Sequence, residues 1–209
     1  MAGTSTKRRW LVPEVVQTSA MDCGPASLKC LLEGFGISAS YGRLREACQT
    51  DVDGTSIDVL EQVAIQLGMD AEQIMIPVDH LLPPEAQSLP AMVVMRLPDG
   101  YTHFVVVWRR HGEWLQVMDP AVGRRWVKCQ RFLQDLYRHR MVVPAAGWRE
   151  WAGSEEFLAP LRGRLRVLGA SATAAKTLIS TSLGDPEWFS LAVLDAAIHL
   201  PLVLPPVVT

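Results

Sequence analysis

Apolar side chains recur at helical spacing in the first third of the chain. Residues 24–34 carry apolar side chains on one face, which predicts a helix. A second helix is predicted over residues 40–49. A third is predicted to begin at Thr55, where Asp58 completes a capping box, and to stop at Gly68.

Beyond residue 70 the pattern changes to one typical of β-strands. Five segments rich in Val, Met and Trp are predicted as strands: residues 73–76, 91–97, 102–109, 113–119 and 125–128. A short helix over residues 130–137 and a last strand over residues 141–143 follow. Because the helices precede the strands instead of alternating with them, the order predicts an α+β fold with N-terminal helices packed on an antiparallel sheet.

The last third of the chain has a different character. Residues 144–153 are rich in Pro, Ala and Gly and are predicted as a linker. Helical patterns follow over residues 154–168, 170–182 and 185–200. The sequence therefore predicts one domain over residues 10–144 and, over residues 145–209, a linker with a helical extension of unknown role.

Composition narrows the classes of function. The 209 residues carry a net charge of −2, which gives no general electrostatic reason to bind nucleic acid. The four cysteines are too few for a disulfide scaffold and lack the spacing of a zinc site, so we predict no metal and no other cofactor. The polar, basic first nine residues do not resemble a secretory signal, and no clear transmembrane helix is found. These features predict a reduced, cytoplasmic compartment.

Cys23 lies at the start of the first predicted helix. There the positive end of the helix dipole favours the thiolate, which is the nucleophilic form of cysteine. Gly24 removes a side chain next to the sulfur, and we predict that Gly24 and Asp22, the two neighbours of Cys23, bind substrate. The alternative is that Cys23 is a small buried hydrophobic residue, as most free cysteines are. The remaining cysteines are predicted to be structural: Cys30, Cys48 and Cys129.

A reactive cysteine needs a base and an oxyanion donor. Gln17, six residues before Cys23, is placed to donate to an oxyanion beside the Cys23 backbone N–H. His103 opens an apolar strand. If the next hairpin turns at His111, paired positions sum to 222 and His103 lies directly opposite Asp119, on the same face. A one-residue slip would separate them, and the alternative for Asp119 is an ordinary turn residue.

Three blocks of residues carry a resemblance to a known family. They read Gln17-x5-Cys23-Gly24-Pro25-Ala26-Ser27-Leu28, His103-Phe104-Val105-Val106 and Val117-Met118-Asp119-Pro120-Ala121-x-Gly123. In this order they resemble the bacteriocin-processing cysteine peptidase family, the papain-like domains at the N-termini of peptidase-containing ABC exporters. The resemblance covers about residues 11–143.

The resemblance implies a papain-like fold and a role for each matching residue. Cys23 would be the nucleophile, His103 the general base and later the general acid, and Asp119 the residue that orients His103. Gln17, with the Cys23 backbone, would form the oxyanion hole.

The resemblance also implies a substrate and a partner. Members of the family cleave leader peptides after a Gly-Gly-type site while a bacteriocin-like peptide is matured and exported, at the cytoplasmic face of the inner membrane. No GxxxxGK[ST] motif occurs in the sequence, so the ATP-binding cassette would belong to an exporter that is separate or fused in a longer chain. Two alternatives stay open: a non-cleaving cargo-binding domain that recruits leader-bearing peptides, and a papain-like acyl transferase.

Overall fold

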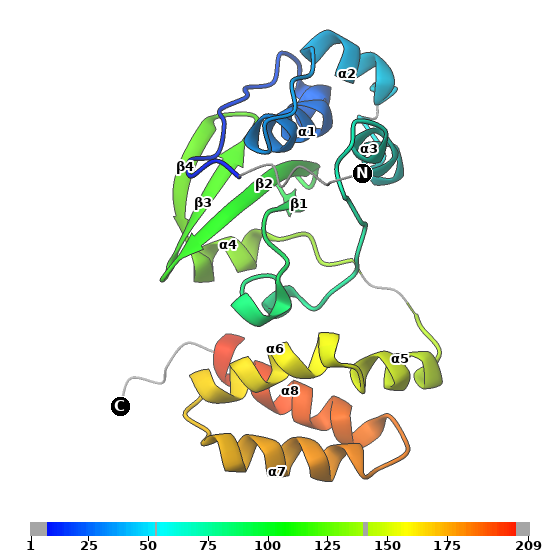
Figure 1. The fold of residues 1–209 in the computed structure, drawn as a ribbon, viewed down its shortest axis with the longest axis vertical. Helices are drawn as coiled ribbons and strands as arrows, with labels where there is room; N and C mark the ends of the chain where they lie inside the picture. The colour runs from blue at the N-terminus through cyan, green and yellow to red at the C-terminus, as the bar shows by residue number, and fades with distance from the viewer. Residues whose placement is uncertain (1–7, 53, 140–141, 204–209) are drawn as a thin grey trace, which may run out of the picture. The chain divides into compact units, whose positions relative to one another are not determined.

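The computed structural model describes residues 8–52, 54–139 and 142–203, and the chain divides into two compact units (Figure 1). The first unit is formed by Met1–Val78 and Leu89–Arg138, and the second by Asp79–Ser88 and His139–Thr209. The chain therefore enters the second unit for ten residues and returns to the first before its final crossing. The boundary predicted at residue 144 lies near the final crossing, and the earlier passage of Asp79–Ser88 through the second unit was not predicted.

Three helices form at the predicted positions in the first unit. They are α1 (Cys23–Gly34), α2 (Tyr41–Ala47) and α3 (Ile57–Gln66), preceded by the short 3-10 helix η1 (Ala20–Asp22). The cap of α3 is one residue later than predicted. Ser56, not Thr55, accepts a hydrogen bond from the Val59 backbone N–H at 3.3 Å. Gly68 follows the end of α3 with φ of +89°, as expected of a helix stop.

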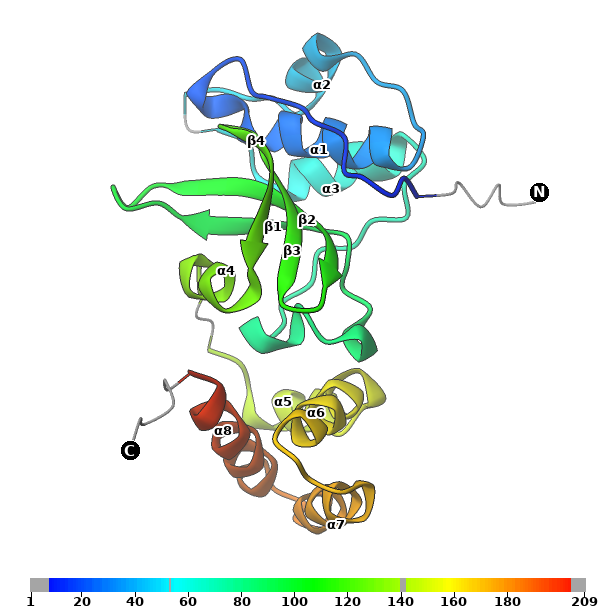
Figure 2. The same cartoon turned by 90° about the vertical axis from the view of Figure 1, so that its left-hand side faces the viewer.

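An antiparallel sheet of four strands in chain order completes the first unit. Its strands are β1 (Ala91–Arg96), β2 (Thr102–His111), β3 (Trp114–Asp119) and β4 (Gly123–Lys128), and the helix α4 (Cys129–Asp135) follows. Helix α1 lies on one side of this sheet and α4 on the other (Figures 1 and 2). The predicted α+β fold, with N-terminal helices on an antiparallel sheet, is confirmed.

Two predicted strands do not form among the described residues. Residues 73–76 lack strand structure because no strand lies beside them. The Gln73 backbone N–H instead donates to the Glu61 carboxylate of α3 at 2.7 Å, while Ile74 and Met75 are exposed. In the segment 141–143, Met141 lies outside the described residues, and the other two residues are not in a strand.

Helix α1 approaches the sheet closely at Trp108, a fully buried residue of β2. A Cβ built on Gly34 would lie 2.2 Å from the Trp108 ring, so this glycine is required by packing. Trp108 also packs edge-on against Phe35, with ring centroids 5.6 Å apart, and donates from its indole N–H to the Arg9 carbonyl at 3.0 Å. These contacts fix α1, and hence its first residue Cys23, against β2.

The second unit is helical. It contains η3 (Pro84–Ala86) and four longer helices, α5 (Ala145–Ala152), α6 (Glu155–Val167), α7 (Ala172–Leu183) and α8 (Phe189–Val203). The predicted linker 144–153 is wrong, because α5 forms there and packs Trp148, Trp151 and Ala152 against the apolar core of this unit. Among the described residues, no helix has the length and hydrophobicity needed to cross a bilayer.

A buried charge network holds Asp79–Ser88 within the second unit. Arg164 of α6 is only 3% exposed and donates to the carboxylates of both Asp79 and, at 2.9 Å, Asp195 of α8. His199 of α8 also contacts Asp79, with 2.6 Å between Nε2 and Oδ1. One guanidinium therefore joins two carboxylates that lie far apart in the sequence, and this pairing offsets the cost of burying charge.

Candidate active site

Cys23 is the first residue of α1 and is half-buried. The 3-10 helix η1 leads directly into it and is capped by Ser19, whose hydroxyl accepts from the Met21 backbone N–H at 3.4 Å. Backbone N–H groups of Phe104 and Gly24 form hydrogen bonds with the Cys23 sulfur. The thiol therefore lies at a helix N-terminus and faces the beginning of β2.

The two neighbours of Cys23 are held by the protein. Asp22 is fully buried, and its carboxylate accepts from the Thr18 hydroxyl at 2.8 Å and from Arg45 Nε of α2 at 2.7 Å. Gly24 is also buried, and a Cβ there would lie 3.2 Å from the Thr55 side chain. We expected both residues to bind substrate. These contacts fix Asp22 in the turn before Cys23 and pack Gly24 close to Thr55, and substrate binding by the two residues stays a prediction.

His103 and Asp119 are brought together as predicted, but by a different register. Their side chains are joined by a hydrogen bond of 2.8 Å between Nε2 and Oδ1, and they are 6% and 7% exposed. Val106 pairs with Met118, so extending the register by one residue places Asp119 opposite Val105, two residues from His103. The residue numbers of paired positions here therefore sum to 224, so the predicted sum of 222 is wrong by two. An even shift keeps both side chains on one face of the sheet, and a diagonal neighbour is within reach of an imidazole.

The carboxylate of Asp119 has two further partners that the sequence did not indicate. Its Oδ1 accepts from the Ala121 backbone N–H at 3.0 Å, and its Oδ2 pairs with Arg125 Nη2 of β4 at 2.7 Å. Burial alone would raise the pKa of Asp119, but hydrogen bonds from His103 and Ala121, aided by the charge of Arg125, lower it. Asp119 is therefore held ionised and fixed in orientation.

The charges of Cys23 and His103 stabilise each other. Burial by itself would lower the pKa of His103, but the hydrogen bonds to Asp119 and Cys23 raise it from 6.5 to about 9. Burial would also raise the pKa of the Cys23 thiol, but hydrogen bonds from His103 and the backbone N–H of Phe104 outweigh it and lower that pKa. Because Nε2 of His103 is occupied by Asp119, Nδ1 is the ring nitrogen left to face the sulfur. The arrangement favours a thiolate–imidazolium pair at neutral pH.

The other three thiols lie in environments that favour the neutral form. Burial raises the pKa of Cys30 above its ordinary range, the pKa of Cys48 to about 11, and also the pKa of Cys129. Cys30 of α1 and Cys48, which follows α2, are buried in apolar clusters. Cys23 is therefore the cysteine whose surroundings suit a nucleophile.

Gln17 is hydrogen-bonded to the turn at the end of β3, next to Asp119. Its backbone N–H donates to the Pro120 carbonyl at 2.9 Å, which places it next to the turn that follows Asp119. The side chain is half-buried, and its Oε1 is buried with no hydrogen-bond partner among the described residues. The four predicted residues thus come from the segment before α1, the start of α1, the start of β2 and the end of β3.

Comparisons with known proteins identify a family for this chain. The model of the Peptidase C39 family matches residues 12–145. The lactococcin-G-processing and transport ATP-binding protein LagD of Lactococcus lactis subsp. lactis is 31% identical over 110 residues, which cover 53% of this chain and 16% of that protein. The probable functional amyloid protease FapD of Pseudomonas aeruginosa is 30% identical over 129 residues, covering 58% of this chain and 55% of that protein.

A solved structure shows the same fold. The peptidase domain of Streptococcus ComA, described as a bifunctional ABC transporter involved in a quorum-sensing pathway, aligns with a TM-score of 0.53 at 26% identity, covering 59% of this chain and 90% of that domain. The chain spans only part of LagD and FapD, the curated relatives compared above. The resemblance inferred from the three sequence blocks is confirmed, and the family model covers well over half of the chain: it belongs to the Peptidase C39 family.

Proposed function

We propose that this chain is a cysteine endopeptidase that cleaves leader peptides after a Gly-Gly-type site during the maturation and export of bacteriocin-like peptides. The hydrogen-bonded line of Cys23, His103 and Asp119 carries the proposal, because it supplies a stabilised thiolate, a proton donor and an orienting carboxylate. The processing and transport role in the name of LagD supports the substrate class.

The proposed reaction begins with attack of the Cys23 thiolate on the carbonyl carbon of the second small residue of the leader. The Gln17 side-chain amide and the Cys23 backbone N–H donate to the developing oxyanion. The imidazolium of His103 protonates the leaving amine as the C–N bond breaks, leaving a thioester on Cys23. His103, now neutral, removes a proton from water, which hydrolyses the thioester and regenerates the thiolate.

We further propose that the chain acts with an ABC exporter, fused or separate, at the cytoplasmic face of the inner membrane. The support is that LagD and the Pediococcus acidilactici protein PedD, which matches 92% of this chain at 24% identity, are both named as transport and processing ATP-binding proteins. The ATP-binding cassette would then be supplied by the exporter.

The test uses a synthetic leader peptide that ends in Gly-Gly and continues into a short core segment. Wild type, Cys23→Ala and the matched control Cys129→Ala are incubated with it, and the products are identified by mass spectrometry. We expect a single cut after the second glycine by wild type and Cys129→Ala. We expect binding without cleavage by Cys23→Ala, and no cut in a peptide whose second glycine is replaced by valine.

The same experiment separates the alternatives. If wild type binds the peptide but leaves it intact, the chain is a cargo-binding domain and the enzyme proposal fails. If an added amine is ligated to the leader in place of water, the chain is an acyl transferase. Cleavage by Cys23→Ala at the wild-type rate would remove Cys23 from the proposed mechanism.

A further inference from the structure

Three tryptophans of the first unit are exposed near one another, around the β2–β3 hairpin. Trp10, Trp114 and Trp126 are 65%, 46% and 47% exposed. His111 links them, since it contacts the ring of Trp10 at 5.2 Å and that of Trp126 at 5.3 Å and pairs with Trp114 across the hairpin. We call these four residues the tryptophan face. Such a contiguous exposed aromatic group marks an interaction surface.

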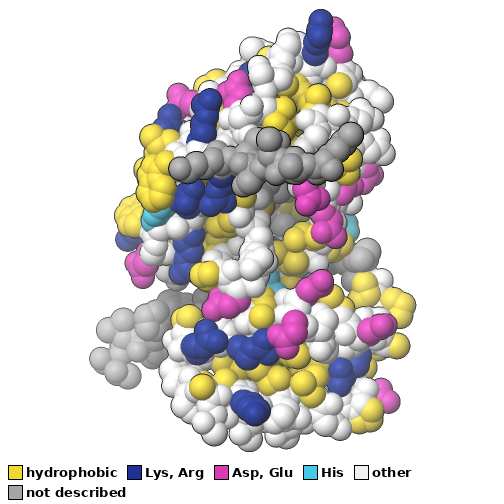
Figure 3. Space-filling model, in the orientation of Figure 1, with side chains coloured by type: hydrophobic (Ala, Val, Ile, Leu, Met, Phe, Trp, Pro, Cys, Tyr) yellow, Lys and Arg dark blue, Asp and Glu magenta, His cyan; other side chains and the backbone are white. Residues whose placement is uncertain are grey.

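Cationic side chains are interleaved with the tryptophan face. The guanidinium of Arg109 lies 4.7 Å from the centre of the Trp10 ring, and Lys128 Nζ lies 5.8 Å from that of Trp114. Arg124 lies on the same face of β4 as Trp126 and Lys128. On the side where Figure 1 labels β3 and β4, Figure 3 shows hydrophobic and Lys or Arg side chains next to one another. Positive charge is thus gathered here in a chain whose net charge is −2.

The covered ring faces argue against nucleic acid as the partner. Bases are bound without sequence preference by stacking on open aromatic rings. Here one face of Trp10 carries Arg109 and one face of Trp114 carries Lys128, so less ring surface is open for stacking.

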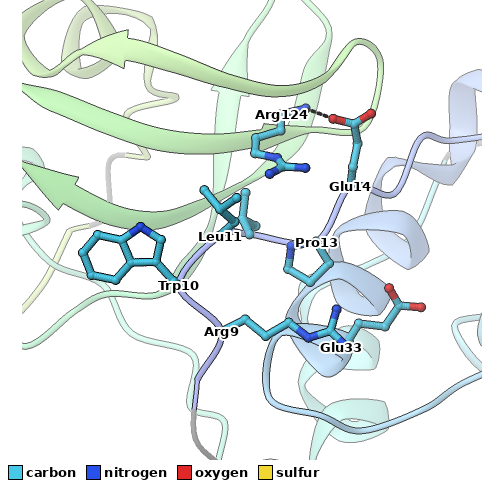
Figure 4. Close-up of a pocket in the computed structure, with 8 residues that line it drawn as sticks. Arg9, Trp10, Leu11, Pro13, Glu14, Glu33 and Arg124 are labelled. Carbon is cyan, nitrogen blue, oxygen red and sulfur yellow. Dashed lines mark hydrogen bonds between the residues drawn. The ribbon is translucent and has the colours of Figure 1, made fainter.

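The hollow beside Trp10 argues against an acidic peptide helix. It has a volume of about 570 Å³, and its lining includes the carboxylates of Glu14 and Glu33 as well as Arg9 and Arg124 (Figure 4). The Glu14 carboxylate accepts from the Arg124 backbone N–H at 3.2 Å, so this acid is fixed in place. The two carboxylates and two guanidinium groups balance in charge, so this hollow gives no net attraction to an acidic peptide helix, whereas Arg109 and Lys128 are not among the residues that line it.

We propose that the tryptophan face and its cations bind the surface of an anionic lipid bilayer. Tryptophan prefers the interface between headgroups and hydrocarbon, where its ring is partly buried and its N–H stays hydrated. Arginine and lysine beside it are attracted to anionic headgroups. The combination of indole edges and flanking cations on an exposed sheet end matches that chemistry, and it would hold the peptidase at a membrane independently of any exporter contact.

The test measures co-sedimentation of the full chain with vesicles of phosphatidylcholine alone or mixed with phosphatidylglycerol. We expect binding to the anionic vesicles, a blue shift of tryptophan fluorescence, and loss of binding at high salt, where surface charges are screened. Arg109→Gln with Lys128→Gln should weaken partitioning by about fivefold for each charge removed. Trp114→Ser with Trp126→Ser should weaken it on the order of tenfold.

Matched controls lie elsewhere on the surface. Trp188→Ser removes a tryptophan that is 42% exposed in the second unit, and Arg96→Gln removes an exposed cation of β1. Both should bind like wild type. The proposal is overturned if anionic vesicles are not bound, if the controls lose as much binding as the tested variants, or if the variants abolish self-association or capture of an acidic peptide instead.

Discussion

Replacing Asp119 by asparagine tests whether one carboxylate sets the charge state of the site. The substituted side chain would preserve the shape of the carboxylate and remove its negative charge. Its amide oxygen can still accept from His103 Nε2 and from the Ala121 N–H, at the distances of 2.8 and 3.0 Å now spanned by Oδ1. Its NH2 group would face Arg125, which is half-exposed and free to move toward water. The substitution therefore removes charge while keeping the orientation of His103.

The expected effect follows from the pKa of His103, which the hydrogen bonds to Asp119 and Cys23 raise from 6.5 to about 9. A raised pKa keeps the imidazolium present until the pH passes 9. With the charge at position 119 removed, this limit should move down toward 6.5. For a complete return, the protonated fraction at pH 8 would fall from roughly 0.9 to roughly 0.03, about a thirtyfold loss of the ion pair.

The assay is kcat/KM between pH 5 and 10 on a fluorogenic leader peptide ending in Gly-Gly. Wild type should show a bell whose alkaline limb lies near pH 9 and whose acid limb reports the lowered pKa of the Cys23 thiol. Asp119→Asn should narrow the bell from the alkaline side, while Asp135→Asn, which removes an exposed carboxylate of α4, should leave it unchanged. An alkaline limb that stays near pH 9 in Asp119→Asn would refute the assignment of Asp119 as the residue that raises the pKa of His103.

Three further predictions concern labelling, packing and acid stability. Iodoacetamide at mildly acidic pH should modify Cys23 before the other thiols. His103→Ala should raise the pKa of the Cys23 thiol, measured from the pH dependence of the labelling rate. Earlier modification of another cysteine would contradict the prediction. Gly34→Ala should lower the free energy of unfolding by about 2 kcal/mol or more in urea titrations, because the added methyl group would overlap Trp108, and an unchanged value would mean that α1 can shift. Burial lowers the pKa of His80 from 6.5 to about 4, so between these values the unfolded chain binds more protons than the folded chain. The free energy of unfolding should therefore fall as the pH drops from 6.5 to 4. His80→Phe should reduce this pH dependence, and an unaltered pH dependence would point to another group.

The candidate residues Cys23 and His103 could be selected from the sequence because their positions depend on local sequence. A cysteine at a helix start and a histidine at a strand start can be recognised without knowledge of distant packing. The register between His103 and Asp119 was predicted wrongly for two reasons. His111 pairs with Trp114 and is not the centre of the turn, so the first pairs of the hairpin sum to 225, and an irregularity between Val107 and Arg109 then lowers the sum to 224. The shift of two residues preserved the face, and therefore the pairing survived an incorrect alignment of the strands.

The distant partners of the site residues were not predicted. Asp22 is a polar neighbour of Cys23 in the sequence, but its charge is matched by Arg45 on another helix, and this pairing depends on how α2 packs beside α1. Arg125, which holds the second oxygen of Asp119, is one of several arginines along β4 and α4, and only the sheet register selects it.

The division of the chain into two units also depends on contacts between residues far apart in the sequence. Composition marks residues 144–153 as a linker, yet Trp148, Trp151 and Ala152 gain an apolar face to bury once α6 to α8 are present, so a helix forms. Asp79 carries no sign in the sequence that its partner is Arg164, 85 residues later. Because a buried arginine must be paired, this contact draws Asp79–Ser88 into the second unit. A chain cut at residue 144 would retain Asp79 without its partner Arg164. The helical unit therefore includes ten residues of the connection between α3 and β1, Asp79–Ser88, which the sequence motifs did not indicate.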